Sequence, residues 1–221
     1  STWNTRLQER LVEELQEVVK KDPKGPQAAP ALALMAEIME KPALQQTREA
    51  AAVLLRLFAL DGSARGEIAL PEIGSVTQLS ARRDGSDLYF TFASFLRPAT
   101  VYRFDFASGR LQPFHPPTSA FDASRYETRA LFYQSKDGTR VPIFVTLRKD
   151  TKLDGSHPTM LFGYGGFNVG VTPNYSAAVA GWLELGGIYA VANLRGGSEY
   201  GSEWHRAGTR ERKQNVFDDF I

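Results

Sequence analysis

The chain has 221 residues, of which 43% are hydrophobic and 23% are charged, a composition typical of a globular protein with one large or two small domains. Its net charge of +1 gives no overall field that would attract nucleic acid or a membrane surface, so we expect neither as a partner. The lack of cysteine excludes disulfides, thiolate catalysis and cysteine metal sites.

The first 55 residues have the pattern of a helical segment. Leucine and valine recur at helical spacing over residues 7–19, and residues 20–30 then interrupt the pattern with three prolines. A second helix is predicted over residues 31–40 and a third over residues 47–55. We expect these helices to pack against protein rather than a membrane surface, because acidic residues share their polar face.

The same segment shows no targeting signal. Its first ten residues lack a basic stretch followed by an apolar core, so no signal peptide is visible. No apolar run in the sequence approaches the roughly 20 residues that a membrane-spanning helix needs. We expect a cytoplasmic location, with the periplasm as the alternative.

From residue 56 to residue 121 the pattern changes from helical to alternating. Turn signals at Asp61-Gly62, Asp84-Gly85 and Ser108-Gly109 separate short strand-like runs such as DLYFTFAS and TVYRFDFASG. This spacing predicts an antiparallel meander that makes up one propeller blade and part of another. No Gly or Pro linker marks the change at Val53–Arg56, so we hypothesise a deletion, a fusion or a trimming there.

Residues 122–221 have the element order of a mostly parallel α/β sheet. A hairpin is predicted across Lys136-Asp137-Gly138. Two buried strands, TMLFGY and GIYAVANLRGG, follow it with a helix over Tyr175–Leu185 between them. The chain ends on a predicted helix, NVFDDFI, whose acidic residues we place in its first turns, where they suit the helix dipole.

The glycine-rich sequence Gly163–Phe167 follows the first of these buried strands. A dinucleotide-binding fingerprint would need a third glycine at position 168, which is Asn168, and a helix beginning there. Residues 169–173 read as extended loop instead, so this function is disfavoured. We interpret the glycines as a tight turn at the carboxyl end of a strand, the edge of an α/β sheet where ligands bind.

Ser198 is the first candidate for a catalytic nucleophile in the sequence. A nucleophile elbow needs glycine both two residues before and two residues after the serine. Gly196 satisfies the first requirement and Tyr200 breaks the second, and no other serine meets both. We therefore predict that Ser198 is a loop residue.

For the other candidate catalytic side chains, the sequence indicates no catalytic or metal-binding partner. Three histidines lie far apart without metal-ligand spacing, so no metal site is predicted: His115, His157 and His205. Asp218 and Asp219 are expected to serve the start of the last helix, because the acidic member of a triad usually follows the nucleophile. The basic cluster at residues 209–213 is predicted to be a solvated loop rather than a nucleic-acid patch.

Three stretches between Met160 and Ile221 carry a recognisable pattern: LFGYGGFNVGVTPNYS, AVANLRGGSEYG and WHRAGTRERKQNVFDDF. Together they resemble the prolyl oligopeptidase family of serine peptidases, and they are closer to its proline-specific members than to those that cut after basic residues. The resemblance extends back to about Leu57, where the sequence is similar to the end of the family's propeller. It does not cover residues 1–55.

The resemblance implies a fold class and a division into domains. We expect the front part of an α/β-hydrolase sheet, preceded by an antiparallel β-propeller fragment and an N-terminal helical segment. The expected boundaries place the helical segment at 1–55, the propeller fragment at 56–121 and the catalytic-domain part at 122–221. The propeller of such an enzyme restricts entry to short peptides, and a Ser-His-Asp triad cleaves them after proline without any cofactor.

Two residues match functional positions of that family. Tyr164 matches the tyrosine whose hydroxyl helps to form the oxyanion hole, where a phenol donor stabilises charge on the scissile carbonyl. Phe167 matches an aromatic residue that lines the pocket for the substrate proline, whose apolar faces suit a flat ring. The Arg195–Gly201 loop carries over only as scaffold around the site.

The chain also departs from the family pattern. In the family the nucleophilic serine follows soon after the FDDF helix, and the Asp and His come later still. We therefore expect the triad to lie outside this chain, the remainder of the enzyme to be a partner, and the chain alone to be inactive. The alternative is a non-catalytic fragment, pseudoenzyme or engineered chimera that acts as a binding or assembly module.

Overall fold

The structure, a computed structural model, describes residues 33–37, 54–59, 62–82 and 85–221. The first predicted helix, over residues 7–19, lies outside the described residues. The second, over residues 31–40, is wrong where it can be compared, because Ala33–Glu37 form strand β1. Antiparallel pairing with a distant strand overrides the local helix preference of Ala, Leu, Met and Glu in this case.

Strand β1 belongs to a small antiparallel sheet in the order β1-β2-β3. Strand β2 (Leu54–Phe58) pairs with β1 in a register that sets Ala33 opposite Phe58, and β3 (Ala64–Ile68) lies on its other side. The third predicted helix, over residues 47–55, is therefore wrong at its last two residues, which begin β2.

The next sheet has four antiparallel strands in the chain order β4-β5-β6-β7. They are β4 (Ser75–Ala81), β5 (Asp87–Ala93), β6 (Thr100–Asp105) and β7 (Arg110–Phe114). This is the predicted meander. The predicted turn at Ser108-Gly109 joins β6 to β7, whereas Asp61 and Asp84 of the other two predicted turns lie outside the described residues.

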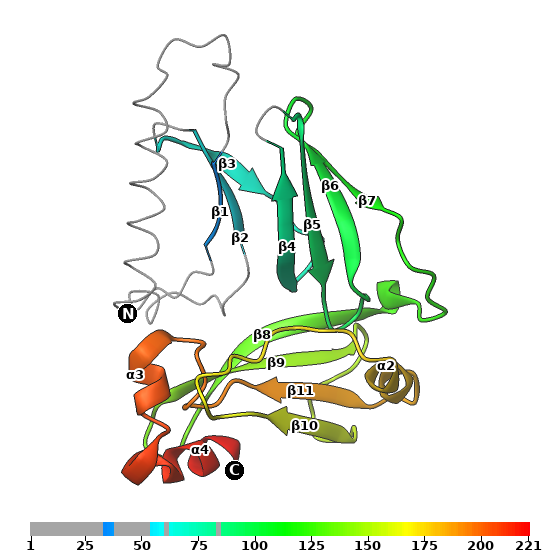
Figure 1. Cartoon of the computed structure of the whole chain (residues 1–221). Helices are drawn as coiled ribbons and strands as arrows, with labels where there is room; N and C mark the ends of the chain where they lie inside the picture. The colour runs from blue at the N-terminus through cyan, green and yellow to red at the C-terminus, as the bar shows by residue number, and fades with distance from the viewer. Residues whose placement is uncertain (1–32, 38–53, 60–61, 83–84) are drawn as a thin grey trace.

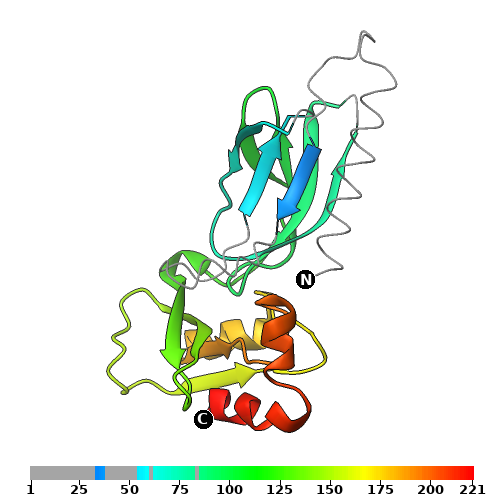
Figure 2. The same ribbon diagram turned by 90° about the vertical axis from the view of Figure 1, so that its left-hand side faces the viewer.

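One apolar core joins these two sheets. Alternate residues of β5 point inward, so that Leu88, Phe90 and Phe92 are at most 1% exposed. They pack with Leu55 and Ile68 of the smaller sheet and with Phe104 of β6. The two sheets therefore form one part of the molecule, seen above the other part in Figure 1 and Figure 2.

The second part is built on a mixed sheet in the order β10-β11-β9-β8. The strands are β8 (Tyr126–Gln134), β9 (Arg140–Arg148), β10 (Thr159–Gly163) and β11 (Ile188–Ala192). The predicted hairpin joins β8 and β9. Among the described strands only β10 and β11 are parallel, so the expectation of a mostly parallel sheet is wrong for this part of the chain.

The two strands that were predicted to be buried differ in their environment. Strand β11 lies between β9 and β10 and is buried as expected. Strand β10 lies at the edge of the described sheet, and its side chains Met160, Leu161 and Phe162 are 43%, 43% and 45% exposed. The prediction of burial is therefore wrong for β10, because an apolar run shows hydrophobicity but not which neighbours cover it.

Short helices lie at the two ends of this sheet (Figure 1). The predicted helix near residues 175–185 is α2 (Ala177–Glu184), whose first turn is capped by the Ser176 hydroxyl. At the other end lie α3 (Gly201–Arg206) and α4 (Gln214–Phe220), and the 3-10 helices are η2 (Ala123–Arg125) and η3 (Arg210–Arg212). None of the helices in the described part of the chain is long and apolar enough to cross a bilayer.

Aromatic packing joins the two parts of the molecule. Phe95, which follows β5, is buried against Phe144 of β9 and Tyr189 of β11, with ring centroids 5.8 Å apart in both pairs. The Ser75 hydroxyl donates a hydrogen bond of 2.8 Å to the Pro173 carbonyl. These contacts place the start of β4 beside the loop that follows β10.

Candidate functional site

Two loops leave the same edge of the mixed sheet. The glycine loop (residues 163–168) and the arginine loop (residues 193–201) both begin at the carboxyl ends of strands. Because β10 and β11 are parallel, these two ends lie at the same edge of the sheet. The Asn168 N–H donates to the Gly196 carbonyl at 3.1 Å and ties the loops together. The prediction that the glycine sequence follows the carboxyl end of a strand is therefore confirmed, and ligand binding at this edge stays a prediction.

Glycine is required where these two loops touch. A Cβ atom on Gly165 would lie 2.5 Å from the Arg195 carbonyl oxygen, a separation that real Cβ atoms essentially never show. Gly196 has a φ of +95°, a backbone conformation that residues other than glycine rarely adopt. The glycines thus allow a direct backbone contact between the loops.

The glycine loop presents both residues to which the sequence assigned functions. Tyr164 is 41% exposed and Phe167 is 88% exposed. Phe167 and Asn168 have φ values of +53° and +58°, in the left-handed region that residues other than glycine seldom occupy. Both side chains are accessible to a ligand, and their roles as oxyanion donor and proline contact stay predictions.

A buried ion pair lies beneath the arginine loop. The Arg195 side chain is 5% exposed and that of Asp219 is fully buried. The Arg195 Nε atom lies 3.0 and 2.9 Å from the two carboxylate oxygens of Asp219, which also accepts the Arg195 backbone N–H at 3.0 Å. The end of α4 is thereby fixed to the carboxyl end of β11.

The β8–β9 turn completes this cluster. The Arg195 Nη1 atom donates to Asp137 at 2.6 Å, and Nη2 donates to the Ser135 hydroxyl at 3.3 Å. The Tyr133 hydroxyl donates to the Asp219 backbone carbonyl. Burial raises the pKa of Tyr133 to about 12, and the charge of Asp219 adds to the rise. Three segments that are distant in sequence therefore meet at Arg195.

This cluster corrects the prediction for the acidic pair of the last helix. Asp218 and Asp219 lie in the last turn of α4 and not in its first turns, where the structure has no acidic residue. The signal that was missed is helical spacing, since Asp219 follows the buried Val216 by three residues and shares its face.

Acid should weaken the contact between the β8–β9 turn and Arg195. The hydrogen bond from Arg195 lowers the pKa of Asp137 from 3.8 to about 2, with help from the Thr139 N–H. Since the folded-state pKa is the lower one, this stabilisation is present above 3.8 and is lost as pH falls toward 2. Because the Asp137 side chain is 48% exposed, we expect Asp137→Asn to cost under about 1 kcal/mol at neutral pH.

Urea denaturation of the full-length protein at pH 7 and near pH 3 measures this effect. The difference between wild type and Asp137→Asn should shrink at the lower pH. Glu203→Gln is the matched control, because its ion pair with Arg206 lies on the surface with the Glu203 side chain 81% exposed. A difference that grows on acidification would contradict the sign of the pKa change.

A second polar cluster ties the arginine loop to the residues after the glycine loop. The buried Asn193 donates through Nδ2 to the Val171 carbonyl at 2.8 Å and to Glu199 Oε1 at 3.0 Å. The same Glu199 oxygen accepts the Val171 N–H at 2.9 Å. We did not predict this cluster, although a polar residue directly after a buried strand is a signal for one.

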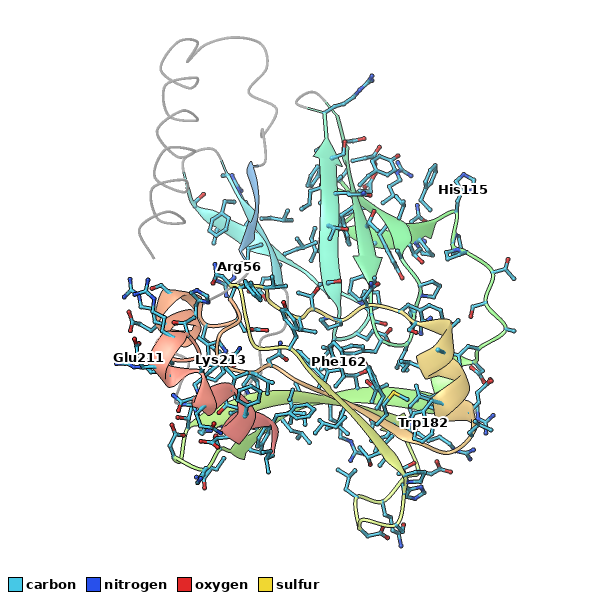
Figure 3. All side chains as sticks on the ribbon, turned by 60° about the horizontal axis from the view of Figure 1, so that its bottom comes forward. Arg56, His115, Phe162, Trp182, Glu211 and Lys213 are labelled. Carbon is cyan, nitrogen blue, oxygen red and sulfur yellow. The ribbon has the colours of Figure 1, made fainter. Side chains whose placement is uncertain are left out.

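Ser198 lies in the arginine loop, as predicted, and has no catalytic partner there. No described histidine hydrogen-bonds its hydroxyl. The His205 Nδ1 atom lies 2.7 Å from the Gly196 carbonyl, to which it must donate. His157 lies beside Gly186, at the amino end of β11, and His115 lies beyond β7, well away from the loops (Figure 3).

One member of the basic cluster at residues 209–213 contacts the site. The Lys213 Nζ atom donates to the Gly165 carbonyl at 2.6 Å. Lys213 is exposed, as are Arg210 and Arg212, so the cluster is solvated as predicted. The prediction of a loop is wrong for Arg210–Arg212, which form the 3-10 helix η3.

Two family models match this chain. The model described as "Prolyl oligopeptidase, N-terminal beta-propeller domain" matches residues 36–117, and "Prolyl oligopeptidase family" matches residues 173–221. The first match runs across Val53–Arg56, where we hypothesised a deletion or fusion, and that hypothesis stays untested. The propeller match also begins inside the segment for which helices were predicted.

Sequence relatives cover most of this chain. A prolyl endopeptidase of Elizabethkingia miricola is 42% identical over 155 residues, which are 70% of this chain and 22% of the relative. Prolyl oligopeptidase ophP of Omphalotus olearius is 43% identical over 146 residues, which are 64% of this chain and 20% of the relative. The chain thus spans about a fifth of the length of the curated relatives that it matches.

Solved structures share the same arrangement. One from a study of two prolyl endopeptidases superposes with a TM-score of 0.75 at 44% identity, covering 87% of this chain and 27% of that one. Prolyl oligopeptidase B of Galerina marginata superposes with a TM-score of 0.69 at 33% identity, covering 76% of this chain and 24% of that one.

Proposed function

Since the chain belongs to the prolyl oligopeptidase family, we propose that the protein to which it contributes is a serine peptidase that cleaves short peptides after proline. The exposed pair of Tyr164 and Phe167 on one loop at the carboxyl edge of the sheet carries this proposal. Residues 122–221 would then be the front part of an α/β-hydrolase domain. The strands before them would be propeller.

Tyr164 and Phe167 have different tasks in this proposal. The Tyr164 hydroxyl donates a hydrogen bond to the oxygen of the scissile carbonyl, where negative charge develops during attack. The Phe167 ring packs on the apolar face of the substrate proline, which has no N–H to satisfy. One residue lowers the barrier and the other selects the substrate.

The buried clusters make these tasks feasible. A catalytic donor stabilises a transition state only when it is held in place before the reaction begins. The Arg195–Asp219 pair fixes the arginine loop, and the backbone contact at Gly165 and Gly196 transmits that order to Tyr164. Rigid support therefore surrounds two accessible side chains.

This proposal does not assign the catalytic nucleophile to any residue of this chain. Ser198 is the one serine with half of the elbow pattern, and no histidine activates it among the described residues. We propose that the Ser, His and Asp of the triad are supplied by other residues of the whole protein. The 221-residue chain alone would then have no measurable peptidase activity.

Cleavage of chromogenic peptides tests the proposed function. The full-length protein should release chromophore from a peptide ending in proline, and at least about 100-fold more slowly from the same peptide ending in alanine. The 221-residue chain alone should release none. Equal cleavage after both residues, or no cleavage by the full-length protein, would contradict the proposal.

A binding or assembly module is the second candidate. The exposed Met160, Leu161 and Phe162 on the edge strand β10 favour it, since apolar side chains on a sheet edge promote association. Light scattering after size exclusion distinguishes the two. A folded 221-residue chain that forms one monodisperse species favours an independent module, and heterogeneous aggregation favours a part of a larger sheet.

A further inference from the structure

Lys213 joins the start of the last helix to the glycine loop. It lies between η3 and α4 in the sequence. Figure 3 labels it at the end of the mixed sheet where α3 and α4 lie. Its Nζ atom donates to the Gly165 carbonyl across 48 residues of sequence. The same atom lies 6.0 Å from the centre of the Phe217 ring, one turn further along. The ammonium group is therefore held between α4 and the loop.

The loop that Lys213 contacts needs such support. Phe167 and Asn168 are consecutive residues in the left-handed region, and such conformations persist only when the surroundings fix them. Among the described residues, three hydrogen bonds hold the loop: Asn168 N–H to the Gly196 carbonyl, Val169 N–H to the Gly166 carbonyl, and Lys213 to the Gly165 carbonyl. Of these three, the last is donated by a side chain.

The hydrogen bond from Lys213 matters because the Gly165 carbonyl lies between the two candidate site residues. Gly165 directly follows Tyr164 and lies two residues before Phe167. A net rotation about the backbone bonds of Gly165 would therefore turn the Tyr164 and Phe167 side chains relative to each other. A charged donor gives a stronger hydrogen bond than a neutral one, so it resists that rotation more firmly.

We infer that Lys213 is a positioning residue that orients Tyr164 and Phe167 by fixing the Gly165 peptide, an inference that rests on the proposed function. This role requires no contact between Lys213 and the substrate. It acts through the loop, and misplacement of a catalytic donor by about 1 Å suffices to slow a reaction strongly.

Three variants of the full-length protein test this inference. Lys213→Met keeps an unbranched apolar side chain, shorter by one heavy atom, and removes the charged donor. Lys213→Arg restores a cationic donor. Arg212→Met is the matched control, because Arg212 is an exposed cation on the adjacent turn and makes no described side-chain hydrogen bond.

The expected result for Lys213→Met is a fall in kcat of about tenfold toward a proline peptide, with KM changed by less than about threefold. Lys213→Arg should recover most of this loss and Arg212→Met should show none. Hydrogen exchange gives an independent readout. The amides of Asn168 and Val169 should exchange faster in Lys213→Met, because their hydrogen bonds belong to the same loop.

The outcomes separate this inference from the proposed function. Wild-type kcat and wild-type exchange at Asn168 and Val169 in Lys213→Met would overturn the role of Lys213 while leaving the peptidase intact. A wild-type protein that cleaves no proline peptide would overturn the proposed function, and the exchange comparison would still decide whether Lys213 orders the loop. A loss in Arg212→Met equal to that in Lys213→Met would show a general charge effect and overturn the inference.

Discussion

Replacing Tyr164 by phenylalanine in the full-length protein should lower kcat toward proline peptides by about 10²- to 10³-fold, the usual cost of one lost oxyanion donor. The substitution removes a single hydroxyl and keeps the ring that shapes the exposed loop. Because the hydroxyl acts on charge that develops during the reaction, KM should change little. The side chain is 41% exposed, so the fold should tolerate the change.

Steady-state kinetics on a proline peptide measure this effect. Tyr89→Phe is the matched control, because Tyr89 lies in β5 of the propeller part and packs on Phe114 through its ring, which the variant keeps. The control should retain wild-type kcat and KM. A Tyr164→Phe protein with wild-type kcat would show that the glycine loop does not contribute the oxyanion donor.

Breaking the buried ion pair should have the largest effect on stability. Arg195→Met would leave the fully buried carboxylate of Asp219 without its bidentate partner, and such changes typically cost about 3–5 kcal/mol. The pair connects α4, the arginine loop and the β8–β9 turn, so its loss affects all three. Urea denaturation of the full-length protein measures the cost.

Two further variants identify the cause of that loss. Arg195→Met combined with Asp219→Leu removes both charges and should recover much of the stability, because no uncompensated charge then remains buried. Arg206→Met breaks a surface pair whose side chains are 67% and 81% exposed, and it should cost under about 1 kcal/mol. If Arg195→Met costs no more than Arg206→Met, the buried pair does not hold the loops.

The sequence predicted correctly the strands and turns whose signal lies within a single short stretch of residues. The alternation in DLYFTFAS became β5 with Leu88, Phe90 and Phe92 inside. The Lys136-Asp137-Gly138 signal became the β8–β9 turn, where Gly138 has a φ of +82°. In both cases the residues that carry the signal lie within the element itself, so one stretch of sequence suffices.

Contacts between distant residues explain the errors. Residues 33–37 favour a helix by themselves but pair with β2 as a strand. The apolar side chains of β10 suggested burial, although they lie at the edge of the described sheet. The sequence offered no local sign that Asp219 meets Arg195, 24 residues earlier, or that Lys213 meets Gly165. The candidate side chains Tyr164 and Phe167 came from family resemblance, and their supporting contacts came from the structure.

Active-site labelling with a fluorophosphonate tests most directly the claim that this chain supplies the oxyanion loop of a serine peptidase and not its nucleophile. Mass spectrometry of the labelled full-length protein should locate the probe on a serine outside these 221 residues, and the 221-residue chain alone should remain unlabelled. A probe on a serine of this chain, with Ser198 the first to examine, would contradict that division of roles.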